Sequence, residues 1–231
     1  MEAIILAGGK GTRLRSVVSD IPKPMAPIGG KPFLSYILKY LKRWGISHII
    51  LSVGYKYEAI KDYFGDNYDG INISYCIEEY PLGTGGAIKK ALSMANEDNV
   101  FIINGDTYFD ADMNDLFDYH IKKKSDLTIA IKPIEKCERY GSVLVEDGRI
   151  TGFTEKEYRE KAFINAGVYI IKKSLLDNFI LDEKFSIEDD FFSRYYKELN
   201  FFAQIQDKYF IDIGIPEDYE QAQKELIKLY E

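Results

Sequence analysis

The sequence contains little cysteine, and its two cysteines, Cys76 and Cys137, lie far apart without metal-type spacing. We therefore predict two reduced thiols, with Cys76 buried in a strand. No apolar run is long enough to cross a bilayer, and the N-terminus lacks a basic segment followed by a long apolar one. These absences favour a cytoplasmic protein without a membrane partner.

An excess of basic charge is also absent. The formal net charge is −7 and the sequence pI is about 5.1. A general nucleic-acid grip needs a basic face, so we expect no nucleic-acid partner, although a local basic pocket stays open. The 231 residues, 46% of them hydrophobic, suit one soluble globular domain, and we expect a single domain over 1–231. A homo-oligomer is left open.

The most informative stretch lies at the N-terminus, where a short apolar run predicts a buried strand. Glycines and basic residues follow it directly: Gly8, Gly9, Lys10, Gly11 and Arg13. Backbone N–H groups in such a turn form an anion cradle, so we predict a nucleotide-phosphate loop. Neither the P-loop nor the dinucleotide fingerprint fits, because Leu14 stands where the latter needs glycine. A plain glycine turn between strand and helix remains the alternative.

The first half of the chain alternates between apolar runs and amphipathic segments. Strands are predicted at 49–54, 71–75 and 100–104, and helices at 33–44, 58–64, 82–96 and 115–124. The proline-rich segment 19–32 is expected to run extended near the first loop. This alternation is typical of a parallel α/β sheet.

The second half is richer in strands, which we predict at 127–131, 142–145, 150–153, 163–171, 201–205 and 209–212. A hairpin turn at 146–149 suggests a meander that shapes one side of a pocket. Helices are expected at 186–198 and from Pro216 onward.

Two aspartates and two lysines stand out. Asp106 and Asp212 each end an apolar run, where ligands of open α/β sheets bind, and together they could hold Mg²⁺. A turn or cap aspartate is the alternative for each. Lys23, fixed between two prolines, and Lys156 could neutralise phosphate charge, although a solvated surface lysine is the ordinary case.

Seven motifs in order give the chain a resemblance to the sugar-1-phosphate nucleotidyltransferases over nearly its whole length. They are Gly8–Leu14, Pro22–Met25, Pro81–Ala87, Gly105–Asp106, Phe153–Lys156, Asn165–Gly167 and Phe210–Gly214. Within these enzymes, Leu14–Val18, Lys23–Pro27 and Leu51–Tyr55 look most like the D-glycero-α-D-manno-heptose 1-phosphate guanylyltransferases.

The resemblance implies a Rossmann-like nucleotidyltransferase fold, with a mixed, mostly parallel central sheet and a smaller β-rich sugar-binding part. It implies an enzyme that transfers a guanylyl group from GTP to a sugar 1-phosphate, with the heptose phosphate favoured, and releases pyrophosphate. The product, GDP-heptose, would serve the synthesis of capsule or surface polysaccharide. It also assigns residue roles, as follows. Catalytic: Arg13, Lys23 and Asp106; nucleotide: Leu6, Ala7, Gly8, Gly9, Gly11, Thr12, Arg13, Lys23, Glu78, Gly83 and Thr84; sugar phosphate: Gly141, Glu155, Lys156 and Asn165; Mg²⁺: Asp106 and Asp212.

Glu78 carries the preference for guanine. A carboxylate only accepts hydrogen bonds, and guanine offers a ring N–H beside an amine, whereas uracil and thymine offer one N–H between two carbonyls. The alternative is that Glu78 is an exposed loop acid and that Glu79 or the backbone reads the base.

The chain departs from the family pattern in two ways. Gly85 replaces the usual alanine and is expected to leave room near the nucleotide, and the sequence stops at Glu231, so we expect no C-terminal β-helix domain.

Three other functions remain open. They are the same chemistry with mannose or glucose 1-phosphate or another base, a non-catalytic nucleotide-sugar sensor, and a glycosyltransferase. The last would use a D-x-D metal motif, for which Asp110-Ala111-Asp112 has the form, although these acids look solvated.

Overall fold

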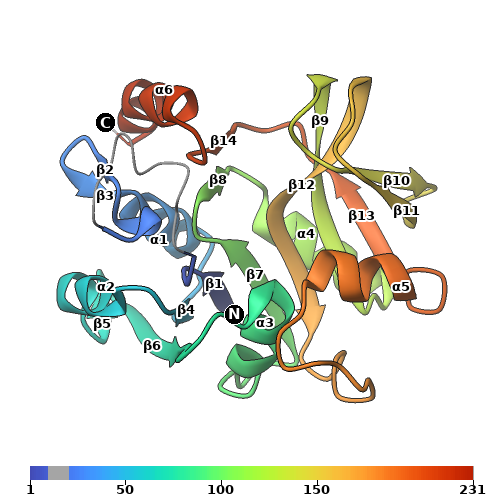
Figure 1. The fold of residues 1–231 in the computed structure, drawn as a ribbon, viewed down its shortest axis with the longest axis horizontal. Helices are drawn as coiled ribbons and strands as arrows, with labels where there is room; N and C mark the ends of the chain where they lie inside the picture. Colours follow the sequence, from blue (N-terminus) through green and yellow to red (C-terminus); the bar gives the residue numbers. More distant parts are fainter. Residues whose placement is uncertain (10–20, 231) are drawn as a thin grey trace.

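The computed structural model describes residues 1–9 and 21–230. Within these residues, ten strands form one mixed sheet in the order β10-β11-β13-β9-β12-β7-β1-β4-β6-β5, and two pairs of short strands lie outside it (Figure 1). The strands are β1 (Glu2–Leu6), β2 (Pro27–Ile28), β3 (Lys31–Pro32), β4 (His48–Val53), β5 (Asn67–Tyr68), β6 (Ile71–Ile77), β7 (Asn99–Asn104), β8 (Thr107–Phe109), β9 (Leu127–Cys137), β10 (Ser142–Glu146), β11 (Arg149–Thr154), β12 (Arg159–Lys172), β13 (Phe201–Ile205) and β14 (Phe210–Asp212).

Helices connect most of the strands in the first half. The first-half helices are the 3₁₀ helix η2 (Lys23–Met25), α1 (Phe33–Arg43), α2 (Tyr57–Phe64), α3 (Gly83–Leu92) and α4 (Met113–Lys123). The second half contains the π-helix η3 (Ile187–Phe192), α5 (Ser193–Tyr195) and α6 (Pro216–Lys228). No described helix is both long and apolar enough for a membrane span.

Parallel pairing joins β7, β1, β4 and β6, the strands of the nucleotide half. Ile4 of β1 pairs with Ile50 on one side and Ile102 on the other. Continuous apolar runs suit such strands because both faces of a parallel sheet are covered. The strand–helix alternation predicted for the first half is confirmed.

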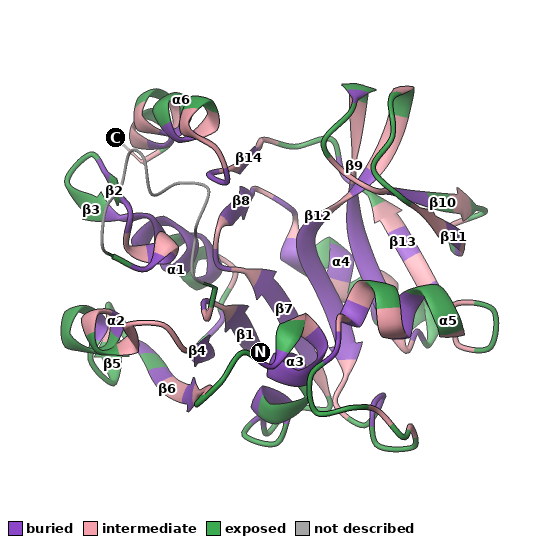
Figure 2. Cartoon of the chain, in the orientation of Figure 1, coloured by how far each residue is buried: buried purple, intermediate pink, exposed green. Residues whose placement is uncertain are grey.

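Side chains of successive strand residues enter two cores, one on each face of the sheet. Ile5 belongs to the core that includes side chains of α1, α2, α4 and α6, whereas Ile4 belongs to the core that includes side chains of α3, η3 and α5. Figure 2 shows the central strands buried between these helices. The fold therefore has three layers, and the ends of the central strands open onto loops.

The second half departs from a meander. β9 and β12 form a long antiparallel pair, and β10 and β11 form the predicted hairpin. However, β13 lies between β11 and β9 and runs parallel to β9, so the meander prediction was wrong. In a simple meander, each strand pairs with the next strand in the sequence. Here β9 and β11 instead pair with β13, which comes much later in the chain.

Two local predictions also need correction. The proline segment contains η2, because Pro24 sits at one of its first positions, where a missing N–H is harmless. The predicted helix at 186–198 begins as the π-helix η3, which is a rare form often found at functional sites.

Candidate functional site

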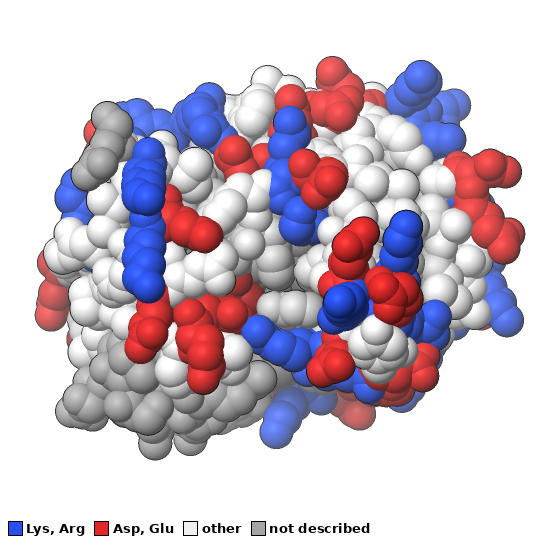
Figure 3. Space-filling view, turned by 90° about the horizontal axis from the view of Figure 1, so that it is seen from above, with Lys and Arg blue, Asp and Glu red and all other residues white. Residues whose placement is uncertain are grey.

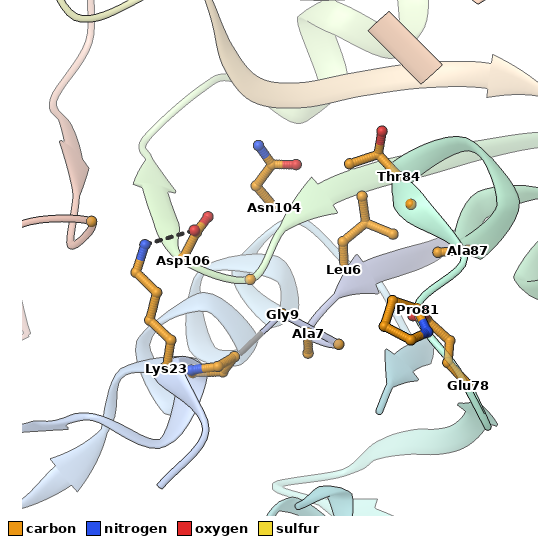
Figure 4. A pocket seen from close by; sticks show the side chains of 15 residues that line it. Leu6, Ala7, Gly9, Lys23, Glu78, Pro81, Thr84, Ala87, Asn104 and Asp106 are labelled. Atoms are coloured by element: carbon orange, nitrogen blue, oxygen red, sulfur yellow. Dashed lines mark hydrogen bonds and ion pairs between the residues drawn. The ribbon is translucent and has the colours of Figure 1, made fainter. Parts of the chain in front are cut away.

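A cavity of about 430 Å³ lies where β1 and β7 end and α3 begins (Figure 4). It contains nine of the residues predicted for the site: Leu6, Ala7, Gly8, Gly9, Lys23, Glu78, Gly83, Thr84 and Asp106. Its position matches the rule that ligands of open α/β sheets bind beyond the carboxyl ends of strands. The predicted Gly11, Thr12 and Arg13 lie outside the described residues, as does Lys10.

Glu78 is held firmly against the glycine loop. Its Oε1 accepts a hydrogen bond from the Ser52 hydroxyl at 3.0 Å, and its Oε2 accepts one from the Leu82 backbone N–H at 3.3 Å. A Cβ at Gly8 would lie only 2.6 Å from Oε1. A side chain at position 8 would therefore displace this carboxylate, which two hydrogen bonds hold in the cavity wall.

Lys23 lies between the two predicted metal ligands. Its Nζ is 2.7 Å from Oδ2 of Asp106 and 3.6 Å from Oδ1 of Asp212, and its side chain is only 12% exposed. Asp106 lies in the turn between β7 and β8, and β8 pairs antiparallel with β14, which places Asp212 opposite Thr107. This short two-stranded sheet brings the two aspartates together.

The two carboxylates suit a hard divalent cation. Oδ1 of Asp212 is buried and accepts no hydrogen bond from the described residues. Burial, followed by the neighbouring Asp106, raises the pKa of Asp212, while Lys23 opposes the rise. The described residues hold no cluster of three or more metal-ligating side chains. A cation here would thus complete its shell with water or with oxygens of a substrate, as Mg²⁺ commonly does with phosphates.

Thr84 links α3 to η3. Its hydroxyl donates to Glu188 at 2.8 Å and accepts from the Ile187 backbone N–H at 2.9 Å. Nearby, a Cβ at Gly85 would lie 2.1 Å from the Phe185 ring. The expectation that Gly85 leaves room near the nucleotide is therefore wrong, because Phe185 fills that space.

The four predicted sugar-phosphate residues lie on or next to the strands of the second half: Asn165 is on β12, Gly141 directly precedes β10, and Glu155 and Lys156 directly follow β11. Ser142 pairs with both Thr154 and Ile164, which brings the neighbouring Gly141, Glu155 and Asn165 toward one another. Lys156 and Glu155 are exposed just after β11. These residues lie outside the wall of the cavity, whose described lining comes from the nucleotide half and from Gly214.

The chain matches known proteins over nearly its whole length. The model of the family described as "Nucleotidyl transferase" matches residues 2–228. This chain belongs to the nucleotidyl transferase family. It is 56% identical over 226 residues to the D-glycero-alpha-D-manno-heptose 1-phosphate guanylyltransferase of Aneurinibacillus thermoaerophilus, with 98% of each chain covered. A protein of the same name from Campylobacter jejuni is 49% identical over 220 residues, which cover 95% of this chain and 97% of that one.

A solved relative carries a nucleotide analogue. The crystal structure of HddC from Yersinia pseudotuberculosis complexed with GMP-PN has a TM-score of 0.85 and 40% identity, and the match covers 96% of this chain and 98% of HddC. Together these likenesses identify a nucleotidyltransferase, with the Rossmann-like fold that the sequence predicted.

In this nucleotidyltransferase, the D-x-D acids are structural. Asp110 pairs with Arg43, and Asp112 caps α4 by accepting a hydrogen bond from the Asp115 N–H at 2.9 Å. Both acids are partly exposed, and each also has a protein partner. Their engagement removes the motif that would have favoured a glycosyltransferase.

Six further residues line the cavity of this nucleotidyltransferase without having been predicted: Pro24, Pro81, Ala87, Asn104, Gly105 and Gly214. All but Asn104 lie within the motifs quoted above, although no site role was assigned to them. Asn104 is different, since it is the polar residue that ends β7. Its place at the end of a buried strand was the signal that could have identified it.

Proposed function

We propose that this protein transfers GMP from GTP to D-glycero-α-D-manno-heptose 1-phosphate, giving GDP-heptose and pyrophosphate. Identity of 56% and 49% to two proteins of that name, over nearly the full length of each, carries the proposal. The HddC complex with GMP-PN supports a guanine nucleotide as ligand. A cytoplasmic location and a supply of GDP-heptose for capsule or surface polysaccharide complete the proposal.

Glu78 is proposed to read the guanine base. Its carboxylate is held by Ser52 and Leu82, yet each oxygen retains a further lone pair, and Glu78 lines the cavity. The ring N–H and amine of guanine would donate to it side by side. Because the carboxylate is already oriented, little side-chain freedom is lost on binding.

The triphosphate is proposed to lie between the glycine loop and the Lys23 ammonium. Asp106 and Asp212 would hold Mg²⁺, with the fit described above. When bound, the cation would neutralise phosphate charge. Lys23 and the predicted Arg13 would supply further positive charge, which is the main requirement of such a transfer.

The sugar 1-phosphate is proposed to be gripped by Lys156, while Gly141, Glu155 and Asn165 face the sugar. Its phosphate oxygen attacks the α-phosphorus of GTP in line, and pyrophosphate leaves. No general base is needed, because the attacking oxygen is already anionic at neutral pH. Orienting the two anions is thus the main task of the protein.

A substrate panel tests the proposal. Purified protein is given GTP, UTP, dTTP or ATP with heptose 1-phosphate, mannose 1-phosphate or glucose 1-phosphate, and pyrophosphate release is measured. We expect the highest kcat/KM for GTP with the heptose phosphate. A preference for UTP or dTTP would overturn the guanylyl assignment, and no release with any pair would favour a nucleotide-sugar sensor.

The base assignment has its own variant. Glu78→Ala should lower the ratio of kcat/KM for GTP to that for UTP, because a site built around a polar partner rejects bases that leave it unpaired. Glu79→Ala, which removes the exposed neighbouring acid, is the matched control. An unchanged ratio in Glu78→Ala with a reduced one in Glu79→Ala would assign the base to Glu79 instead.

A further inference from the structure

Asn104 is a polar side chain in the cavity wall that has no hydrogen-bond partner among the described residues. It ends β7, pairs through its backbone with Leu6 of β1, and is partly buried. Its amide forms no hydrogen bond with any described residue, although buried and half-buried amides are usually satisfied. In Figure 4 the amide points away from Gly9 and lies between Asp106 and Thr84.

The backbone of β12 is shaped to make room for this amide. Gly167 has a φ of +77°, and a Cβ at this position would lie 2.8 Å from the Nδ2 of Asn104 and 2.9 Å from its Cβ and Cγ. The pairing of β12 with β9 shifts register between Asn165 and Tyr169. Asn165 stabilises this irregular segment by accepting a hydrogen bond from the Gly167 N–H at 3.0 Å.

Asn104 therefore lies where the two halves of the molecule meet. On one side are the phosphate-end residues Lys23 and Asp106, and across from it is the β12 segment that carries Asn165. Glu78 lies beyond Leu6, on the other side of the cavity (Figure 4). An amide offers both donors and an acceptor, so it can satisfy a hydroxyl group in either direction.

We propose that Asn104 is a specificity residue that hydrogen-bonds a ring hydroxyl of the sugar 1-phosphate. The inference rests on the proposed function, because it needs a sugar phosphate as the second substrate. The lack of a hydrogen-bond partner among the described residues leaves the amide available to the ligand, and Gly167 lets the backbone of β12 pack against it. A ribose hydroxyl of the nucleotide is the other group with this chemistry, and the test separates the two.

The first test compares Asn104→Ala and Asn104→Leu with the wild type. We expect KM for the sugar phosphate to rise about fivefold to tenfold, as for loss of a neutral hydrogen bond in a closed site, while KM for GTP changes less than about twofold. The thermal midpoint should stay close to the wild type, since no hydrogen bond within the described protein is lost. Asn72→Ala, which removes an exposed amide of β6 that accepts a hydrogen bond from Asn67 of β5, is the matched control.

The second test uses substrates that lack one hydroxyl. With the wild type, one monodeoxy sugar 1-phosphate should lose about the same factor in kcat/KM, and this loss should vanish in Asn104→Ala. If the penalty for 2′-deoxy-GTP or 3′-deoxy-GTP vanishes instead, Asn104 binds ribose and the proposal is wrong. Equal penalties in both proteins, or a lowered thermal midpoint with unchanged KM, would also overturn it.

The outcome is separable from that of the proposed function. The wild-type substrate panel decides which sugar phosphate and which triphosphate are used. The Asn104 comparison is then made with that pair, whichever it is, so a different preferred sugar leaves this test intact. A wild type without any sugar-phosphate activity would overturn the proposed function and this inference together.

Discussion

The nucleotide half, formed by β1, β4, β6, β7 and α3, differs from the sugar half, formed by β9 to β12. In the first, the candidate side chains are already tied down: Glu78 to Ser52 and Leu82, and Lys23 to Asp106. In the second, Glu155 and Lys156 are exposed beyond the end of β11. The nucleotide subsite is thus built into the parallel sheet, while the sugar subsite is carried on antiparallel strands at its side.

The surface charge of the molecule is mixed. The face in Figure 3 carries small groups of basic and acidic side chains next to one another, without a broad field of one sign. Because the formal net charge of the chain is −7, we expect anion binding to depend on particular cations placed close to the phosphates, such as Lys23 at 12% side-chain exposure. The two halves therefore differ in how their cations are held: Lys23 of the nucleotide half is prearranged by an ion pair, whereas Lys156 of the sugar half is exposed on the surface.

The largest expected effect tests the prearranged half. Asp106→Asn or Asp212→Asn should lower kcat by about 10³-fold, because removing the charge of a metal ligand forfeits several kcal/mol of transition-state stabilisation. Pyrophosphate release at ordinary Mg²⁺ measures the loss, and circular dichroism checks the fold. Asp110→Asn, which removes the partner of Arg43, is the matched control. Near-normal activity of Asp106→Asn would show that the prearranged nucleotide half does not use Asp106 as a metal ligand.

A second effect concerns the junction between the halves. His120 on α4 is buried and bonds Thr128 of β9 at 2.8 Å and Asn99 of β7 at 3.0 Å. Burial, with a smaller effect of Lys172, lowers the pKa of His120 from 6.5 to about 4. Since the unfolded chain binds the proton more readily, the stability from neutral His120 is complete above pH 6.5 and is lost as pH falls toward 4.

Urea unfolding between pH 4 and 7.5 measures this loss. We expect the free energy of unfolding to fall by up to about 3 kcal/mol across that range on account of His120. His120→Asn should be less stable at pH 7 but should show a flatter dependence on pH, because it cannot titrate. Equal slopes for the wild type and His120→Asn would show that the junction does not depend on a neutral histidine.

The smallest of the three expected effects tests whether Lys156 belongs to the sugar half. Lys156→Ala should raise KM for the sugar phosphate more than about tenfold and leave KM for GTP nearly unchanged, since a charge-assisted contact contributes about 1.5–3 kcal/mol. Lys161→Ala, which removes another exposed lysine from β12, is the matched control. A rise in KM for GTP alone would assign Lys156 to the nucleotide half instead.

The amino-acid sequence alone was enough to predict the α/β class, the strand–loop junction at Gly8 and the acid that follows β7. These features are local: buried parallel strands are continuous apolar runs, and ligand residues stand just after them. It also indicated the family, because seven weak motifs occur in one order. The predicted helix at 33–44 and the strand at 201–205 agree closely with α1 and β13 for the same reason.

Contacts between residues far apart in the sequence could be found only in the tertiary structure. The pairing of β14 with β8 brings Asp212 beside Asp106, and the contact of Phe185 with Gly85 fills a space that the sequence suggested was open. The approach of Gly167 to Asn104 likewise depends on β12 lying next to β7. Sequence periodicity specifies which face of a strand is apolar, but the choice of neighbouring strand depends on packing between segments far apart in the chain.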